Sequence, residues 1–162
     1  MKNLVLLPDE LLYTTSVPVE SIDAEVQELV QEMIETMKHA RGIGLAGVQV
    51  GELRRLFVCD VTGDDPRVFI NPSILETSME ETKYEEGCLS IPTVFSDVRR
   101  PAAIKVQAWN EKGRPFTMSA DGILARVILH EYDHLNGVLF LDHLDEKQRT
   151  KLLKQYETRR KQ

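Results

Sequence analysis

Residues 121–137, DGILARVILHEYDHLNG, contain the pattern that decides how the rest of the chain is interpreted. The apolar residues on both sides of the string HEYDH predict a largely buried helix that starts near Asp121 and ends at Asn136-Gly137. A spacing of four residues places His130 and His134 one turn apart on the same face, where they can share a metal ion. Unpartnered histidines in a buried helix would be costly, which favours a metal site over two surface histidines.

Glu131 lies beside the first histidine, where a carboxylate can act as general base toward water instead of binding the metal. Two histidines need a third protein ligand, and the metzincin pattern H-E-x-x-H-x-x-G-x-x-H fails because Phe140 replaces its last histidine. A downstream glutamate could only be Glu157, which lies among Lys and Arg in a helix expected to be exposed. Cys88, in EEGCLSIP (85–92), is the better candidate, although a lone cysteine is more often a core residue.

A third segment, GIGLAGVQ (42–49), follows the first long helical pattern. Its three glycines allow the backbone to approach a ligand closely, and Gln49 supplies an amide that can donate to an oxyanion. Taken alone, this glycine-rich segment is weak evidence for a binding site, because ordinary connections between helices and strands use the same residues. The other cysteine, Cys59, is expected in the core, and the two cysteines form neither a disulfide framework nor a C-x-x-C redox motif.

The remaining pattern predicts helices separated by short strands. A helix is predicted from Ser21 to Arg41 and a third, exposed helix from near Asp145. The β-rich stretches are RLFVCDV (55–61), VFI (68–70) before Asn71-Pro72, and AIKVQAW (103–109), with a turn at Asn110 to Gly113 leading into RPFTMS (114–119). Because strands and helices do not alternate strictly, the pattern predicts an α+β fold rather than a doubly wound one.

Length and composition are those of a single globular domain. With 162 residues, 42% hydrophobic and 28% charged, residues 1–162 are expected to form one compact domain. The short apolar run before Pro8 is too short for a signal peptide, and no segment is long enough to span a membrane, so a cytoplasmic protein is expected. Residues 145–162 contain seven Lys and Arg against three Asp and Glu, which predicts a basic C-terminal helix able to contact a polyanion.

The segments GIGLAGVQ, EEGCLSIP and HEYDH, in this order and about forty residues apart, resemble the three signature motifs of the peptide deformylases. The resemblance covers nearly the whole chain. It implies an α+β fold with antiparallel sheets packed around the central helix that carries the HExxH motif. It also implies a metal-dependent hydrolase that removes the formyl group from the N-terminal formyl-methionine of newly synthesised proteins and releases formate.

Carried over by motif position, the resemblance implies a role for each matching residue. The implied metal ligands are Cys88, His130 and His134, the general base is Glu131, the oxyanion donors are the Gln49 side chain and the Leu89 backbone N–H, and the substrate contacts are Gly44 and Ile43. The implied cofactor is one divalent ion, Fe²⁺ first, with Zn²⁺, Ni²⁺ or Co²⁺ able to occupy the same site. The implied partners are formyl-methionyl nascent chains. The basic C-terminal helix is expected either to dock on the ribosome or to be an ordinary solvated helix end.

The nearest alternative is a metallopeptidase of the HExxH type, for which a convincing third ligand is missing. A structural zinc site would normally have four protein ligands, whereas here three are found beside a free carboxylate. The sequence departs from the family pattern at three places: Gly47 replaces a common alanine, Leu129 replaces a common glutamine, and Leu12-Tyr13 stand where an arginine is often found. Finally, Glu86 and Arg100 are expected either to form an ion pair that orders the cysteine segment or to remain solvated.

Overall fold

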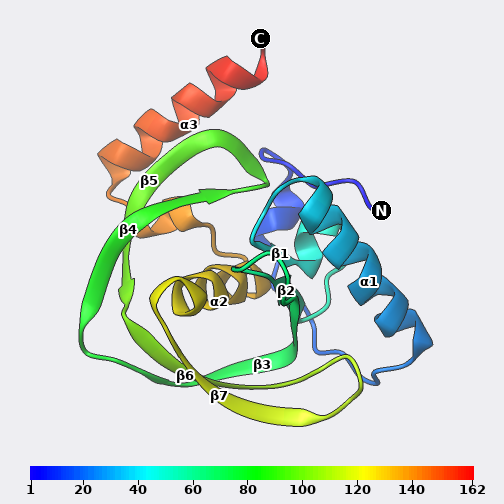
Figure 1. Ribbon diagram of the computed structural model, residues 1–162. Coiled ribbons are helices and arrows are strands. Elements are labelled where there is room, and N and C mark those ends of the chain that lie inside the picture. The colour runs from blue at the N-terminus through cyan, green and yellow to red at the C-terminus, as the bar shows by residue number, and fades with distance from the viewer.

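The computed structural model describes residues 1–162 and contains three α-helices, seven strands and three short 3-10 helices (Figure 1). The α-helices are α1 (Ala24–His39), α2 (Gly122–Leu135) and α3 (Glu146–Arg160). The strands are β1 (Gly44–Ala46), β2 (Leu56–Cys59), β3 (Arg67–Thr77), β4 (Glu81–Cys88), β5 (Ile91–Pro101), β6 (Ala103–Trp109) and β7 (Pro115–Asp121). The 3-10 helices are Glu10–Tyr13, Gly47–Val50 and Phe140–His143. No helix has both the length and the apolar character needed to cross a membrane.

The strands form two antiparallel sheets around the helix that carries the HExxH motif. Five strands pair in the order β1-β2-β3-β6-β7, and β4 pairs with β5 as a separate hairpin. Helix α2 lies at the centre of the molecule, enclosed by the curved strands of both sheets (Figure 1). The predicted α+β class and the antiparallel packing around a central helix are therefore confirmed.

Strand β2 separates two apolar cores because its side chains alternate between its faces. Phe57 and Cys59 belong to the core that contains the apolar side of α2, whereas Leu56 and Val58 belong to the core under α1. Helix α1 is fixed at its start by Asp23, whose carboxylate accepts a hydrogen bond of 3.0 Å from a backbone N–H of the first turn. The packing of these two cores on either side of β2 places β1 directly against α2. Strand β1 carries part of the glycine-rich segment.

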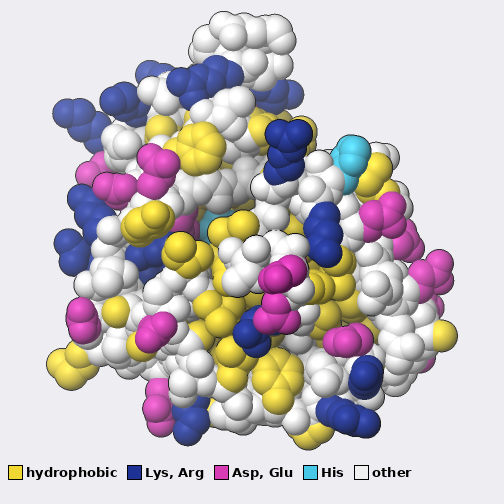
Figure 2. Space-filling view, viewed as in Figure 1, with side chains coloured by type: hydrophobic (Ala, Val, Ile, Leu, Met, Phe, Trp, Pro, Cys, Tyr) yellow, Lys and Arg dark blue, Asp and Glu magenta, His cyan; other side chains and the backbone are white.

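Helix α3 is less exposed than its composition suggested. Leu152 and Tyr156 are buried in a third apolar core, and the Tyr156 hydroxyl donates a 2.5 Å hydrogen bond to the carbonyl oxygen of Leu7. Two apolar residues four positions apart are enough to attach one side of a helix, while its Lys and Arg side chains face solvent. Those cations are visible as a cluster over α3 in Figure 2. The prediction of an exposed C-terminal helix was therefore wrong for the side that carries Leu152 and Tyr156.

The strands differ from the predicted pattern in two places. Strand β3 continues through Asn71-Pro72, where the predicted strand ended, because the pairing register shifts there and Pro72 occupies the irregularity. Asn71 has a positive φ of 50°, and its side chain is hydrogen-bonded to the backbone of Val19. The β4–β5 hairpin was not predicted, because most β4 residues are exposed, half of them are charged, and they show no apolar alternation.

The buried position of Cys59 predicts a chemically inert thiol. Burial raises its pKa to about 12, so the thiol stays protonated in mildly alkaline buffer. We expect iodoacetamide to alkylate the partly exposed Cys88 of the folded, metal-stripped protein while leaving Cys59 unmodified, as measured by peptide mass spectrometry. Unfolding in guanidinium should make both cysteines reactive. Equal labelling of the two thiols in the folded protein would contradict the buried assignment.

Candidate metal centre

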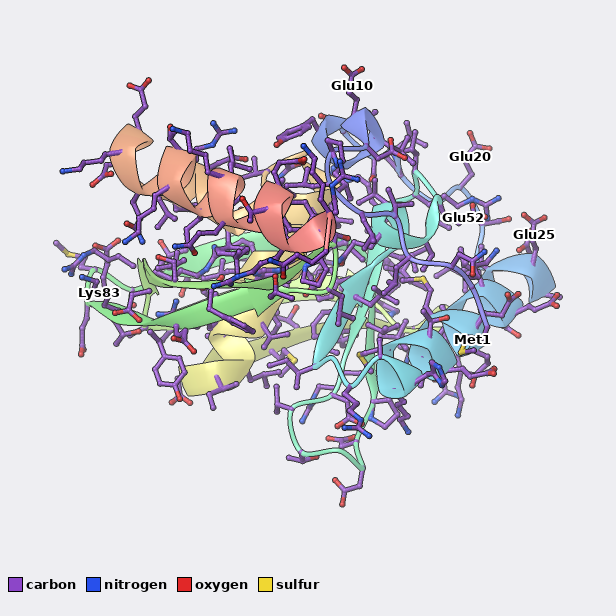
Figure 3. The ribbon with its side chains drawn as sticks, turned by 90° about the horizontal axis from the view of Figure 1, so that it is seen from above. Met1, Glu10, Glu20, Glu25, Glu52 and Lys83 are labelled. Carbon is purple, nitrogen blue, oxygen red and sulfur yellow. The ribbon has the colours of Figure 1, made fainter.

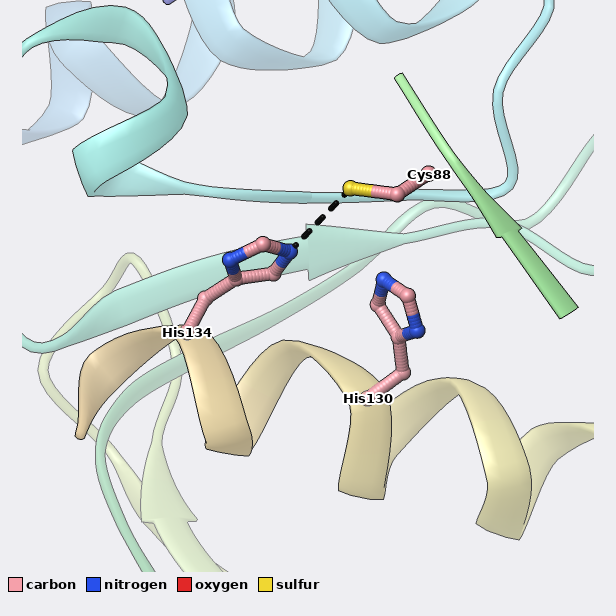
Figure 4. A group of neighbouring side chains, drawn as sticks. All are labelled: Cys88, His130 and His134. Carbon is pink, nitrogen blue, oxygen red and sulfur yellow. Dashed lines mark hydrogen bonds between the residues drawn. The ribbon is translucent and has the colours of Figure 1, made fainter. Parts of the chain in front are cut away.

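The three predicted ligands come together between the β4–β5 hairpin and α2. Cys88 is the last residue of β4, and His130 and His134 project from successive turns of α2 (Figure 4). One ligand atom from each residue lies within 4.8 Å of the other two, and Cys88 Sγ is 3.4 Å from His134 Nε2. Sulfur and nitrogen bound to one tetrahedral ion would be separated by about 3.6 Å, so this spacing fits a shared metal.

The donor set and its burial also fit a divalent transition-metal ion. His134 is buried, which lowers its pKa well below the usual value, and the neighbouring His130 lowers it further. The neutral imidazole favoured by this environment is the form that binds metals. One thiolate and two imidazoles suit iron, zinc, nickel or cobalt better than magnesium or calcium, which prefer oxygen ligands.

Glu86 orients the first histidine. The Nδ1–H group of His130 donates to Glu86 Oε1 at 2.9 Å, which leaves Nε2 free to face the cluster. Arg100 donates to both oxygens of Glu86, at 2.6 and 3.0 Å. Burial alone would raise the pKa of Glu86, but the hydrogen bonds from His130 and Arg100 outweigh it and lower the pKa, so the carboxylate remains ionised. Of the two alternatives for Glu86 and Arg100, an ion pair or two solvated side chains, the structure shows the ion pair, and it is buried.

Arg126 is a residue of the Glu86 cluster that the sequence reasoning missed. From α2 it donates to Glu86 Oε2 at 2.7 Å, to the Val98 carbonyl oxygen at 2.7 Å and to the Thr82 carbonyl oxygen at 2.8 Å. It thereby joins the central helix to both strands of the hairpin. The available signal was an arginine inside the apolar run ILARVIL, since a cation is almost never buried without partners.

The glycine at position 44 makes room for the Glu131 carboxylate. A Cβ atom at Gly44 would lie 2.5 Å from Glu131 Oε2, closer than any real contact allows. Glu131 is buried, its Oε2 is 4.0 Å from His130 Nε2, and its Oε1 has no hydrogen-bond partner. Burial raises the pKa of Glu131 to about 7. A carboxyl group with a pKa near neutrality can both accept and release a proton during a reaction.

Gln49 is held with its amide directed at the cysteine. Its Oε1 accepts from the Ala46 backbone N–H at 2.9 Å, while Nε2 donates to Ser90 Oγ at 3.1 Å and to Cys88 Sγ at 3.5 Å. In the same turn, a Cβ atom at Gly47 would lie only 2.8 Å from the carbonyl oxygen of residue 52. Glycine therefore replaces the family's common alanine at a position where the backbone of another segment comes close.

A cavity of about 430 Å³ adjoins the cluster. Its lining includes most of the predicted site residues, namely Ile43, Gly44, Gln49, Cys88, Leu89, His130 and Glu131. Ile91, Pro92 and Phe95 add apolar surface, and in Figure 2 apolar side chains gather near the centre of this face. The structure therefore brings three segments that are far apart in the sequence to one cavity.

A buried carboxyl group beside a cysteine and two imidazoles, at a partly apolar cavity, is the arrangement expected of a metallohydrolase. Residues 1–150 match the family model for polypeptide deformylase. The peptide deformylases of Rhizobium meliloti and Agrobacterium fabrum are 46% and 48% identical to this chain, and the matches cover 96% of it and 92% and 94% of those enzymes.

Solved structures of peptide deformylases have the same fold as this chain. The peptide deformylase of Legionella pneumophila has a TM-score of 0.95 and 37% identity, covering 99% of this chain and 96% of that one. The enzyme of Synechococcus elongatus, in complex with actinonin, has a TM-score of 0.91 and 42% identity, covering 95% and 86%. The chain belongs to the peptide deformylase family. This membership favours the deformylase interpretation over a metallopeptidase of the HExxH type.

The buried partners of Glu86 predict a large stability effect at Arg126. Replacing Arg126 by Met removes one of the donors to the buried Glu86 carboxylate and the side-chain donor to two carbonyl groups, and should lower the free energy of unfolding by about 3 kcal/mol. The matched control is Arg54→Met, which breaks a half-exposed pair with Glu25 and should cost less than about 1 kcal/mol. Urea unfolding of the parent and the two variants measures both changes in the free energy of unfolding. Equal decreases in the two variants would contradict the assigned role of Arg126.

Proposed function

We propose that this chain removes the formyl group from the N-terminal formyl-methionine of nascent proteins, in the cavity beside Cys88, His130 and His134. The observation that carries the proposal is the position of Glu131, a buried carboxyl group next to the three candidate ligands and at the cavity. The reaction is hydrolysis of a linear amide, with formate and a free methionyl amine as products.

We propose Cys88, His130 and His134 as the ligands of one divalent ion, Fe²⁺ first and Zn²⁺, Ni²⁺ or Co²⁺ as substitutes. Such an ion, when bound, supplies Lewis-acid activation of water and of the formyl oxygen. Three protein ligands leave a coordination position open, as expected of a catalytic rather than a structural site.

The protein's own groups then have distinct tasks. Glu131 accepts a proton from the attacking water and delivers it to the leaving amine nitrogen, which the raised pKa of its carboxyl group favours. The Gln49 amide and the Leu89 backbone N–H donate to the oxyanion that forms at the formyl carbon. Ile43 and Gly44 contact the substrate, and the apolar part of the cavity receives the methionine side chain.

The same cavity is proposed to bind actinonin. The deformylases of Synechococcus elongatus and Ehrlichia chaffeensis have been solved in complex with this compound, and both match nearly the whole of this chain.

Formate release from a formyl-methionyl peptide tests the activity. Anaerobically purified, iron-loaded protein should release formate from this peptide and none of the corresponding acid from an acetyl-methionyl control. Glu131→Ala should lose at least about a thousandfold in kcat while keeping its metal, because the carboxyl group transfers the proton but is not a ligand. Absence of formate from folded, metal-loaded protein would refute the proposed reaction.

We further propose that the protein works in the cytoplasm and contacts the ribosome through residues 145–162. The support is the solvent-facing row Lys147, Lys151 and Lys154, which can interact with ribosomal RNA. Replacing these three by Glu should abolish co-sedimentation with ribosomes at low salt and leave peptide deformylation unchanged. Deleting α3 is a poorer test because Leu152 and Tyr156 belong to the core. Unchanged co-sedimentation of the triple variant would refute the contact.

A further inference from the structure

The β4–β5 hairpin contains a bulge that forms one wall of the cavity. The strand pairing is interrupted between Glu86 and Cys88, so that Gly87 alone faces residues 92–95. Three residues of this bulge line the cavity: Pro92, Thr93 and Phe95. The Phe95 ring packs on Gly87, where an added Cβ would lie 2.5 Å from Phe95 Cε1. Bulges of this kind redirect side chains beside functional sites.

Within the bulge, the backbone of Thr93 has an unfavourable conformation. Its φ is +74°, a region that β-branched residues avoid because the side chain crowds the backbone. A residue stays in such a conformation only where the surrounding structure holds it there. The side chain of Thr93 is exposed, so the restraint must come from contacts made by its neighbours or its backbone.

Helix α3 provides these contacts. Val94 is buried in the same apolar core as Leu152 and Tyr156 of α3, and the guanidinium of Arg159 donates to the Thr93 carbonyl oxygen. Seen from above, α3 lies over the β4–β5 hairpin (Figure 3). The neighbouring Arg160 points elsewhere and pairs with Glu157. Two adjacent arginines of one helix thus have different partners, only one of which belongs to the cavity wall.

We propose that Arg159 is a positioning residue for substrate binding, which acts through Thr93 and holds the bulge in its binding-competent conformation. Arg159 lines no part of the cavity and is remote in sequence from the three motifs. The inference rests on the deformylase function proposed above. It gives the C-terminal helix a role in shaping the cavity that is separate from any contact of its lysines.

Loss of the Arg159 contact has a specific kinetic consequence. When the bulge is free to leave its restrained conformation, only a fraction of molecules can bind substrate, and the apparent affinity falls by that fraction. Once substrate is bound, the wall is again in place, and Glu131 and Gln49 are unaffected. We therefore expect KM to rise and kcat to stay constant.

The test compares Arg159→Met, Arg159→Lys and Arg160→Met in the full-length, metal-loaded enzyme with a formyl-methionyl tripeptide. Arg159→Met should raise KM about three- to tenfold with kcat within about twofold of the parent. Arg159→Lys keeps a donor and should recover most of the affinity, and Arg160→Met should match the parent. Activity of the parent enzyme establishes the reaction independently, so its failure is distinct from a failure of this inference.

A second comparison isolates the backbone effect. Asparagine adopts positive φ more readily than threonine, so in a Thr93→Asn background the bulge should depend less on Arg159. Adding Arg159→Met there should raise KM by less than half the factor seen in the parent. Equal KM values for Arg159→Met and Arg160→Met would overturn the proposal, as would a fall in kcat at constant KM. A loss of thermal stability with unchanged KM would also overturn it, because that result indicates a merely structural contact.

Discussion

The buried carboxylate of Glu86 accepts hydrogen bonds from the His130 imidazole and from the guanidinium groups of Arg100 and Arg126, and the metal centre depends on this cluster. Each of these charged groups loses its hydration when it is buried, and the loss is offset only while all partners are present. The cluster connects the β4–β5 hairpin to α2. Because Cys88 lies two residues after Glu86 on β4, the same contacts that orient one candidate ligand also position another.

The rest of the fold places the proposed catalytic groups around this cluster. Alternation along β2 holds β1 against α2, and the missing side chain of Gly44 leaves space for Glu131. The 3-10 turn that follows β1 holds the Gln49 amide toward Cys88. On the opposite side, the bulge of β5 forms a wall of the cavity that α3 supports from outside. Each motif therefore contributes one group that its own segment could not position alone.

Much of this arrangement was predictable from periodicity and spacing. The helix around the HExxH motif and the strand 103–109 were predicted correctly, because apolar residues recur there with the period of the element that forms. The three ligand candidates came from spacing and from resemblance, and the structure brings them within one cluster. Arg126 and the buried side of α3 were missed for a common reason. Both depend on partners distant in sequence, and no local pattern identifies a guanidinium that will bind Glu86 or a tyrosine that will reach Leu7.

X-ray absorption at the metal edge of the zinc-loaded protein tests the central claim, that Cys88, His130 and His134 bind one ion and leave a position open. The account predicts one sulfur neighbour at about 2.3 Å, two imidazole nitrogens at about 2.0–2.1 Å and one further light atom from solvent. Cys88→Ser should remove the sulfur contribution. A spectrum without sulfur, or one with four protein ligands and no solvent position, would contradict the account.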